Sequence, residues 1–480
     1  GGVSQMTSLN ELTIEEAIIG LKKREFSSVD LTKDCLSQIE KVDKKIKSLV
    51  TVTGEQALVD AQWADKMIKD RGAVIFEEYP LLGIPYICKD NFSTKGVKTT
   101  ASSNVLKDYV PPFDSTVVER LKEAGAILLG KANMDAFAHG SSTENSDFFT
   151  TKNPWDTSRV PGGSSGGSSA AVAADMCLFS MGSETGGSIR GPASWCGVTG
   201  LKPSYGRVSR YGVVAMASST DSPGPITKNV VDAAYVLNVV AGKDPRDATS
   251  SPVREFDYTP EKNISLKGIK IGKPASYFNI DLEPGVRKHV EDALNTLKNM
   301  GAEIIEMDLL DPKYSIAVYT ILQRSEVSSN LARFDGIRYG SDRKKFGFEA
   351  KKRIMLGTYT LSSGYYDAYY AKAQKVRTLI KNDFEKAFQN IDVITAPSMP
   401  CIAPKLGESD KSPMFGEMID LLTEPSSVAG LPGISIPCGF SDDMPVGLQF
   451  IGRFNGEKNI ISVASLFQKG TDFHKSKPQL

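Results

Sequence analysis

One stretch of the chain, from Arg159 to Gly212, limits the possible folds more than any other. It is packed with glycine and serine, and it contains the runs GGSSGGSS at 162–169 and TGGS at 185–188. Such a composition is typical of a flexible linker. Apolar segments at 170–174 and 178–181 interleave with the glycines, however, and a disordered tether would gain nothing from them. The stretch is therefore predicted to be folded.

The segments around this stretch alternate between helical and strand patterns. Capping signals at 13–16 and 27–30 open two amphipathic helices, and a third helical pattern covers 57–69. Further helices are predicted at 116–123, 230–240 and 286–297, and strands at 84–88, 126–129, 269–271, 393–395 and 433–436. We expect one α/β fold in which a helical N-terminal part, residues 1–75, continues into a large core over 76–480.

Composition excludes several classes of function. Lysine plus arginine and aspartate plus glutamate both count 57, so the chain has no net field with which to hold a nucleic acid. No apolar run is long enough to cross a bilayer, and residues 1–11 lack the pattern of a secretion signal. We expect no contact with a membrane and a place in the cytoplasm, or in an organelle matrix after processing.

The six cysteines have no paired short spacing, which favours buried free thiols over a disulfide framework or a zinc site. The glycine- and serine-rich stretch has no cluster of metal ligands either, so no metal is expected. A phosphate-binding loop of the form GxxxxGK[ST] occurs nowhere in the chain.

The run GGSSG at 162–166 matches G-x-S-x-G, the nucleophile elbow of α/β-hydrolases. That mechanism also needs a histidine further along the chain. Only His289, in a helical segment that contains lysine, and His474, in a polar tail, could serve, and both are expected to be exposed to solvent. An α/β-hydrolase that uses His474 remains an alternative.

The run TGGS at 185–188 offers a different serine. Its two glycines allow a backbone that turns consecutive N–H groups toward one point, which is an oxyanion hole beside a nucleophile. Each such donor is worth about 2.7–4 kcal/mol at the transition state. These glycines therefore contribute chemistry as well as shape.

Residues 162–206, and above all GSETGGSIR at 182–190, resemble the signature of the amidase signature family. The likeness extends from LGIP at 82–85 to GLQFIG at 447–452. It implies the amidase signature fold, a large mixed β-sheet flanked by helices, with 76–480 as the catalytic core. It also implies a catalytic set of Ser188 as nucleophile, Ser164 behind a cis peptide bond, and Lys89. The oxyanion donors would be the backbone N–H groups of Thr185, Gly186, Gly187 and Ser188.

The chemistry of such a set is consistent with these residue types. Serine is a weak nucleophile and needs a base within hydrogen-bond reach. Lysine can be that base only when neutral, and burial favours the neutral form. Lys89 follows the apolar run 84–88, so it is placed for burial, and Ser164 would relay the proton.

Other runs resemble one branch of the family, the glutaminase subunits of tRNA-dependent amidotransferases. They are SSTENS at 141–146, GRVSRYG at 206–212, SSNLARFDG at 328–336 and LSSGYYDAYY at 361–370. The resemblance implies glutamine as the substrate, which is a zwitterion and needs both a cation and an anion for recognition. It assigns Arg353 to the α-carboxylate, Asp420 to the α-ammonium and Tyr319 to the wall of the pocket.

The same resemblance implies partners. Ammonia would pass to an ATP-using, tRNA-binding subunit. This subunit would be joined to the present chain by a small bridging subunit, and aminoacyl-tRNA would be reached through the complex. ATP and magnesium would belong to the partner, with no cofactor in this chain.

Three positions depart from the pattern of this branch. Ala136 bears on the route of the ammonia, whereas Glu184 and Ser427 are expected to concern local packing or loops. Two further functions stay compatible with the residues. One is a stand-alone amidase that acts on other amides without a partner, and the second is a scaffold without catalytic activity.

Overall fold

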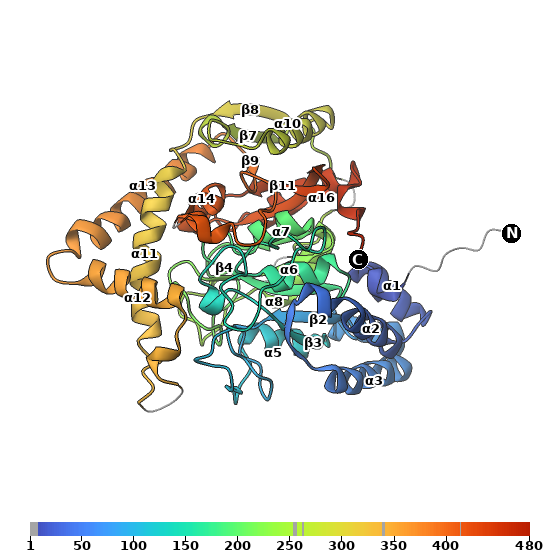
Figure 1. Ribbon diagram of the computed structural model, residues 1–480. Coiled ribbons are helices and arrows are strands. Elements are labelled where there is room, and N and C mark those ends of the chain that lie inside the picture. The colour runs from blue at the N-terminus through green and yellow to red at the C-terminus, as the bar shows by residue number, and fades with distance from the viewer. Residues whose placement is uncertain (1–7, 253–256, 262–263, 338–340, 413) are drawn as a thin grey trace.

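An eleven-stranded mixed β-sheet runs through the computed structural model, which describes residues 8–252, 257–261, 264–337, 341–412 and 414–480 (Figure 1). The pairs β2–β3, β2–β4, β7–β8 and β7–β9 are parallel, and the remaining pairs are antiparallel. In spatial order the strands are β1 (Leu49–Val52), β3 (Ile127–Ala132), β2 (Pro85–Lys89), β4 (Phe179–Glu184), β6 (Ser222–Thr227), β5 (Thr199–Lys202), β10 (Gly433–Ser441), β11 (Met444–Ile451), β9 (Val393–Pro397), β7 (Lys270–Pro274) and β8 (Glu303–Met307).

Helices flank this sheet, so the predicted α/β class with a large mixed sheet is confirmed. They are α1 (Ile14–Lys23), α2 (Ser28–Ile46), α3 (Gly54–Arg71), α4 (Ile75–Glu78), α5 (Thr116–Glu123), α6 (Gly166–Ala173), α7 (Arg190–Cys196), α8 (Val230–Val240), α9 (Ala275–Phe278), α10 (Pro284–Asn299), α11 (Lys313–Leu331), α12 (Phe348–Leu361), α13 (Lys372–Ala387), α14 (Phe415–Ile419), α15 (Glu424–Val428) and α16 (Glu457–Lys469). Both predicted capping signals are complete capping boxes, Thr13 with Glu16 and Ser27 with Asp30.

The N-terminal part contains a strand that the sequence did not reveal. Between α2 and α3 lies β1, which pairs antiparallel with β3 and so joins this part to the edge of the sheet. The strand has only four residues, and only the first of them is fully buried. Such a short run, placed between two long helices, shows no recognisable periodicity.

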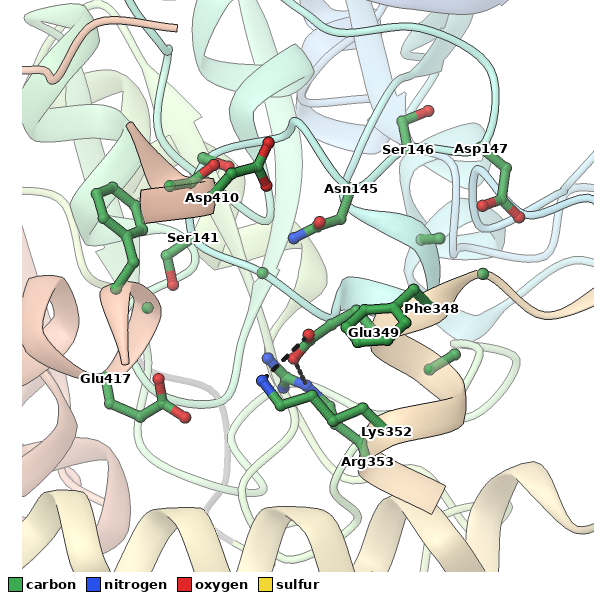
Figure 2. Close-up of a pocket in the computed structure, with 18 of the residues that line it drawn as sticks. Ser141, Asn145, Ser146, Asp147, Phe348, Glu349, Lys352, Arg353, Asp410 and Glu417 are labelled. Carbon is green, nitrogen blue, oxygen red and sulfur yellow. Dashed lines mark hydrogen bonds and ion pairs between the residues drawn. The ribbon is translucent and has the colours of Figure 1, made fainter. Parts of the chain in front are cut away.

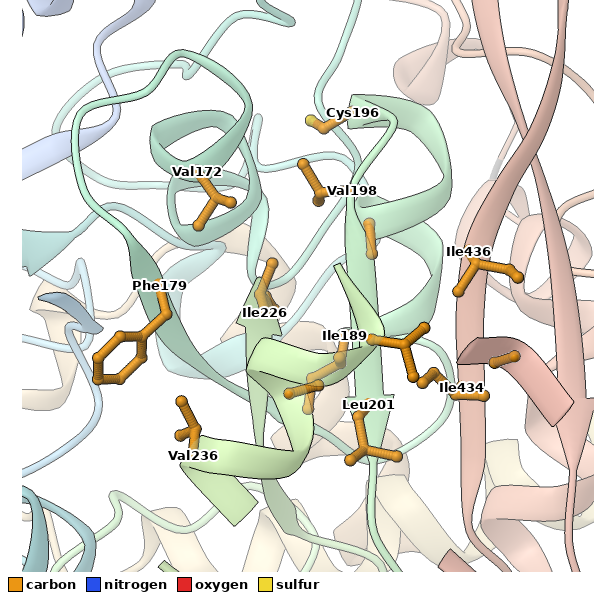
Figure 3. Packing of buried hydrophobic residues seen from close by; sticks show 14 of the residues in the cluster. Val172, Phe179, Ile189, Cys196, Val198, Leu201, Ile226, Val236, Ile434 and Ile436 are labelled. Carbon is orange, nitrogen blue, oxygen red and sulfur yellow. The ribbon is translucent and has the colours of Figure 1, made fainter. Parts of the chain in front are cut away.

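The glycine- and serine-rich stretch is folded, as predicted, and it lies in the interior. It forms α6, β4, α7 and β5 in succession, and β4 lies between β2 and β6 within the sheet. Every residue of α6 and α7 is buried. Small side chains let α6 pack closely, whereas α7 also buries the large side chains of Arg190 and Trp195. Figure 3 shows the surrounding core, to which α6, α7, α8 and strands β4, β5, β6 and β10 contribute Val172, Cys196, Val236, Phe179, Leu201, Ile226, Ile434 and Ile436.

Helices α11, α12 and α13 form a projection on one side of the molecule (Figure 1). The long helix α11 packs against both α12 and α13. These helices bring Tyr319 and Arg353 toward the centre of the fold, on α11 and α12 respectively. In the part of the chain that the structure describes, no helix has the length and apolar character needed to span a membrane.

Candidate active site

Lys89 is the last residue of β2, and its side chain is completely buried. Its Nζ lies 2.8 Å from Ser164 Oγ, 2.9 Å from Ser165 Oγ and 3.0 Å from the carbonyl oxygen of Ser183. Burial lowers the pKa of Lys89 to about 7, while the more distant charges of Asp135, Asp221 and Glu184 oppose the shift. A substantial fraction of this amine is therefore neutral near neutral pH, and a neutral amine has a lone pair that can accept a proton from a hydroxyl group.

Ser164 follows a cis peptide bond, Gly163–Ser164, and lies just before α6. The backbone of Gly163 presses against the segment that carries Asp135 and Ser142. A Cβ atom at position 163 would lie 2.1 Å from Asp135 Oδ2 and 2.6 Å from the backbone nitrogen of Ser142. Only glycine therefore fits at position 163, where the backbone that leads into Ser164 lies against Asp135 and Ser142.

Ser188 lies on the loop between β4 and α7 and is 5% exposed. The backbone N–H of Ser165 donates to the carbonyl oxygen of Ser188 over 3.1 Å, which places the two serine segments side by side. Within the described residues the Ser188 hydroxyl makes no hydrogen bond, so its link to Ser164 is not closed in this state. Such contacts commonly tighten only when substrate binds.

The loop before Ser188 has the character of an anion site. The backbone N–H groups of Gly186, Gly187 and Ser188 find no acceptor among the residues that the structure describes. Glycine is needed at position 187, because a Cβ atom there would lie 2.4 Å from both Asp420 Oδ1 and Thr423 Oγ1. Three successive unused donors beside a serine hydroxyl can stabilise a developing oxyanion.

A buried ion pair holds this loop in place. The guanidinium of Arg190 donates to Glu184 Oε1, with Nη2 at 2.5 Å, and both side chains are completely buried. The other oxygen of Glu184 accepts the backbone N–H groups of Ile189 and Arg190, each at 3.0 Å. Ser427 donates to both Glu184 Oε1 and the carbonyl oxygen of Gly186.

This network shows what two of the departures from the branch pattern do. Glu184 and Ser427 were expected to concern local packing or loops, and in the structure they hydrogen-bond each other and hold both ends of the loop that carries Ser188. The sequence does not show this relationship, because 243 residues separate the two positions.

A small hollow of about 20 Å³ brings Ser188 together with the three residues expected to bind substrate. Tyr319 hydrogen-bonds Thr185 Oγ1 through its hydroxyl over 2.6 Å. Asp420 Oδ2 accepts a hydrogen bond from Ser141 at 2.7 Å. The hollow is lined by Ala138, Gly140, Ser141, Ser188, Met216, Tyr319, Thr320, Gln323, Arg353, Gly416, Glu417, Asp420 and Glu424.

Arg353 is held by Glu349 on the same helix, with Nε 2.7 Å from Oε1. Its two terminal nitrogens have no partner among the described residues, so this end of the guanidinium is available for a carboxylate. Burial raises the pKa of Asp420 to about 7. A cation bound beside Asp420 would favour its ionised form.

Sequence reasoning missed Gln323 and Glu424, which line the same hollow. Glu424 follows Asp420 by four residues, about one helical turn, and this spacing could have indicated a shared wall. Nothing in the sequence around Gln323 marks it, because it is one polar residue among several on α11.

A larger hollow of about 590 Å³ adjoins the first and shares Gly140, Ser141, Arg353, Gly416 and Glu417 with it. Figure 2 shows Lys352 and Arg353 gathered around Glu349, with Glu417 across the opening. Ala136, which departs from the branch pattern, also lines this outer hollow.

The histidines do not support the hydrolase alternative. His289 and His474 were expected to be exposed, but both are half-buried. His289 packs against Gly439 of β10, and His474 lies near Trp155 and Lys477 in another hollow. No histidine is among the described residues that line the hollow at Ser188.

All six cysteines are free thiols, and only Cys401 is not fully buried. Over the ranges that the structure describes, no three His, Cys, Asp or Glu side chains come together in a way that could hold a metal ion.

The model of the amidase family matches residues 30–461. This chain belongs to the amidase family. The family resemblance seen in the sequence is thereby confirmed.

Relatives within the family extend over almost the whole chain. The A-type subunit of glutamyl-tRNA(Gln) amidotransferase from Thermoanaerobacter pseudethanolicus is 53% identical over 98% of both chains. The protein of that name from Caldanaerobacter subterraneus is 52% identical, also over 98% of both. The crystal structure of the same subunit from Thermotoga maritima is 41% identical, with a TM-score of 0.81 over 96% of this chain and 95% of that one.

We predict that Arg190→Met destabilises this amidase by about 3–5 kcal/mol, because it leaves Glu184 buried without its counter-charge. Burial raises the pKa of Glu184, but Arg190 outweighs burial and holds that pKa below its usual value. The ion pair therefore contributes stability above the unfolded-state pKa of about 4.3, and this contribution is lost as pH falls through the lower folded-state pKa. Chemical denaturation between pH 4 and pH 8 measures both effects.

Arg71→Met is the matched control, since Arg71 and Glu78 form an ion pair at 2.6 Å with side chains about half exposed. This substitution should leave the free energy of unfolding nearly unchanged, because solvent screens an exposed ion pair. Equal losses for the two variants would contradict the importance of the buried pair.

Proposed function

We propose that this chain is the glutamine-hydrolysing subunit of a tRNA-dependent amidotransferase. One observation carries the proposal: the buried Lys89 contacts Ser164, the next residue along is hydrogen-bonded to the backbone of Ser188, and Ser188 lines a hollow together with Arg353 and Asp420. The similarity to A-type subunits of glutamyl-tRNA(Gln) amidotransferase supports it.

In the proposed reaction, Ser188 Oγ attacks the carboxamide carbon of glutamine. Its proton passes to Ser164 Oγ, and the proton of Ser164 passes to Lys89 Nζ, 2.8 Å away. The carbonyl oxygen gains negative charge, which the N–H groups of Thr185, Gly186, Gly187 and Ser188 stabilise.

The tetrahedral intermediate then breaks its C–N bond. The leaving nitrogen takes the proton back through the same relay and departs as ammonia, leaving a glutamyl ester on Ser188. Water attacks this ester with Lys89 again accepting the proton, so that glutamine and water become glutamate and ammonia. In this scheme Arg353 binds the α-carboxylate, Asp420 binds the α-ammonium, and Tyr319 forms one wall.

Ammonia released into water at neutral pH is mostly protonated and is then no nucleophile. The proposed function therefore includes a partner that takes up ammonia directly: an ATP-using, tRNA-binding subunit that converts Glu-tRNA(Gln) or Asp-tRNA(Asn), with a small bridging subunit. ATP and magnesium would act there, in the cytoplasm or an organelle matrix. In this proposal ammonia leaves Ser188 through the outer hollow, which Ala136 and Arg353 line, and so reaches the partner.

A stand-alone amidase is a second candidate, and the size of the outer hollow favours it. A space of about 590 Å³ beside the inner site would accept an amide larger than glutamine. Turnover of such amides by this chain alone would support it.

We predict that Ser188→Ala abolishes glutamine hydrolysis, because the attacking oxygen is lost while the oxyanion donors remain. In the wild type, mass spectrometry after reaction with a glutamine-like electrophile should place the adduct on Ser188. An adduct on Ser164 would instead revive the nucleophile-elbow mechanism.

We predict that Lys89→Arg is nearly as damaging as Lys89→Ala, since arginine stays protonated and cannot act as a base. In the wild type the rate should rise with pH and level off above about 7, because the neutral form of Lys89 is the active one and its pKa is about 7. Steady-state rates between pH 5.5 and pH 9 test this. Substantial activity of the arginine variant would mean that Lys89 supplies only charge.

We predict that the isolated chain hydrolyses glutamine slowly and forms no Gln-tRNA, whereas the complex with its ATP-using and bridging subunits does both. A reconstitution assay with and without partners, ATP and Glu-tRNA measures the two products. Full turnover that is indifferent to the partners would favour the stand-alone amidase.

A further inference from the structure

Two carboxyl side chains on one wall of the inner hollow carry oxygens without partners. Glu424, at the start of α15, is 1% exposed, and neither of its carboxyl oxygens has a hydrogen-bond partner within the described residues. Asp420 gives one oxygen to Ser141, while its Oδ1 is unpartnered over the same residues. Buried polar groups are normally satisfied, so such a wall is suited to a polar ligand.

These carboxyls lie directly against the oxyanion loop. A Cβ atom on Gly186 would be 3.3 Å from Glu424 Cγ, and one on Gly187 would be 2.4 Å from Asp420 Oδ1. A ligand whose charged group binds these two carboxyls would therefore lie next to Ser188, so its amide bond could be attacked by that serine.

The nearby arginines offset this pair only in part. Arg353 is bound to Glu349 at 2.7 Å, and Arg324 is bound to Glu417 at 2.7 Å. Their charges, and that of Arg190, act on Asp420 and Glu424 from a distance, without a direct ion pair within the described residues.

Burial accounts for how two carboxyls can lie side by side in this wall. It raises the pKa of Glu424 well above its usual value, and the charges of Asp420 and Glu417 add to this effect. The pKa of Asp420 is raised to about 7. The pair therefore still holds a proton near neutral pH, and a positive charge bound beside it favours release of that proton.

An amide on the facing helix completes the site. Gln323 on α11 is 3% exposed and lines the same hollow, and its Nε2 has no acceptor among the described residues. Two acidic groups and one unused donor in a single enclosed hollow match a ligand that carries both a cation and an acceptor.

We propose that Glu424 and Asp420 form a two-carboxyl subsite for a protonated amine on the amide substrate, and that Glu424 makes the pocket selective for amides that carry such an amine. This inference rests on the proposed function for the identity of the amine, which would be the α-ammonium of glutamine. Gln323 donates to an acceptor on the same molecule. When the ammonium binds, the carboxyl pair releases protons to solvent and becomes its counter-charge.

The test compares L-glutamine with glutaramate, which keeps the carboxamide and the carboxylate but lacks the amine. In the full chain, with partner subunits if they are needed for turnover, the ratio of kcat/KM for glutamine to that for glutaramate should fall about tenfold in Glu424→Gln, mainly through KM. Glu424→Asp, which keeps the acid, should retain more of the preference. The matched control is Glu385→Gln on the exposed surface of α13, which should leave the ratio unchanged.

Binding provides a second readout that needs no turnover. Binding of glutamine to the Ser188→Ala variant can be measured by calorimetry at pH 7 in buffers of different ionisation enthalpy. The protein should release protons when glutamine binds, and the double variant that also carries Glu424→Gln should release fewer. A merely structural glutamate would not change this quantity. Thermal unfolding should show Glu424→Gln to be at least as stable as the wild type, because a buried acid without a partner is removed.

The outcomes separate this inference from the proposed function. If the wild type hydrolyses glutamine but Glu424→Gln keeps the full preference and the full proton release, only the cation subsite is wrong. If glutamine binds in a Glu424-dependent way without being hydrolysed, the subsite stands and the proposed function falls. If neither amide binds, both are overturned.

Discussion

The burial of one amine, Lys89 Nζ, is the constraint on which the rest of the site depends. A lysine side chain taken wholly out of water costs a great deal as a cation, so its pKa falls to about 7. The end of β2 carries it into the interior, and three serine hydroxyls and a carbonyl oxygen surround it in place of water. Lys89 can thus act as a base at neutral pH because β2 ends in the interior of the protein.

The position of the nucleophile depends on a second buried charge. Arg190 cannot lose its proton, so its environment must supply acceptors, and these come from Glu184, Ser426, Ser427, Gln449 and the carbonyl oxygen of Thr423. Because these groups lie on three separate parts of the chain, the ion pair ties β4, β11 and the segment before β10 to one point. The loop with Ser188 runs across that point, which is why the oxyanion donors and the substrate hollow keep their relative positions.

The charges that line the inner hollow can also be understood from the need of buried charged groups for partners. Arg324 on α11 and Arg353 on α12 form ion pairs with glutamates, whereas the two carboxyls next to the oxyanion loop have no ion-pair partner in the described chain. A site arranged in this way binds a cation more readily than an anion at that wall, and it leaves the free end of Arg353 for a carboxylate. Recognition of a zwitterion is the natural outcome.

The sequence by itself determined the local features. It predicted the capping boxes of α1 and α2, the mixed α/β class, and the family, because these depend on residues that are close together in the chain. It also singled out Lys89, Ser164 and Ser188, which the structure places together in the interior, although their roles remain proposals.

Only the tertiary structure decided which distant residues share a wall. The partnership of Glu184 with Ser427, the strand β1 at the sheet edge, the half-buried histidines and the unpartnered pair Asp420 and Glu424 all depend on segments that meet only after folding. Burial and charge pairing are properties of these contacts, and no pattern along the chain encodes them directly.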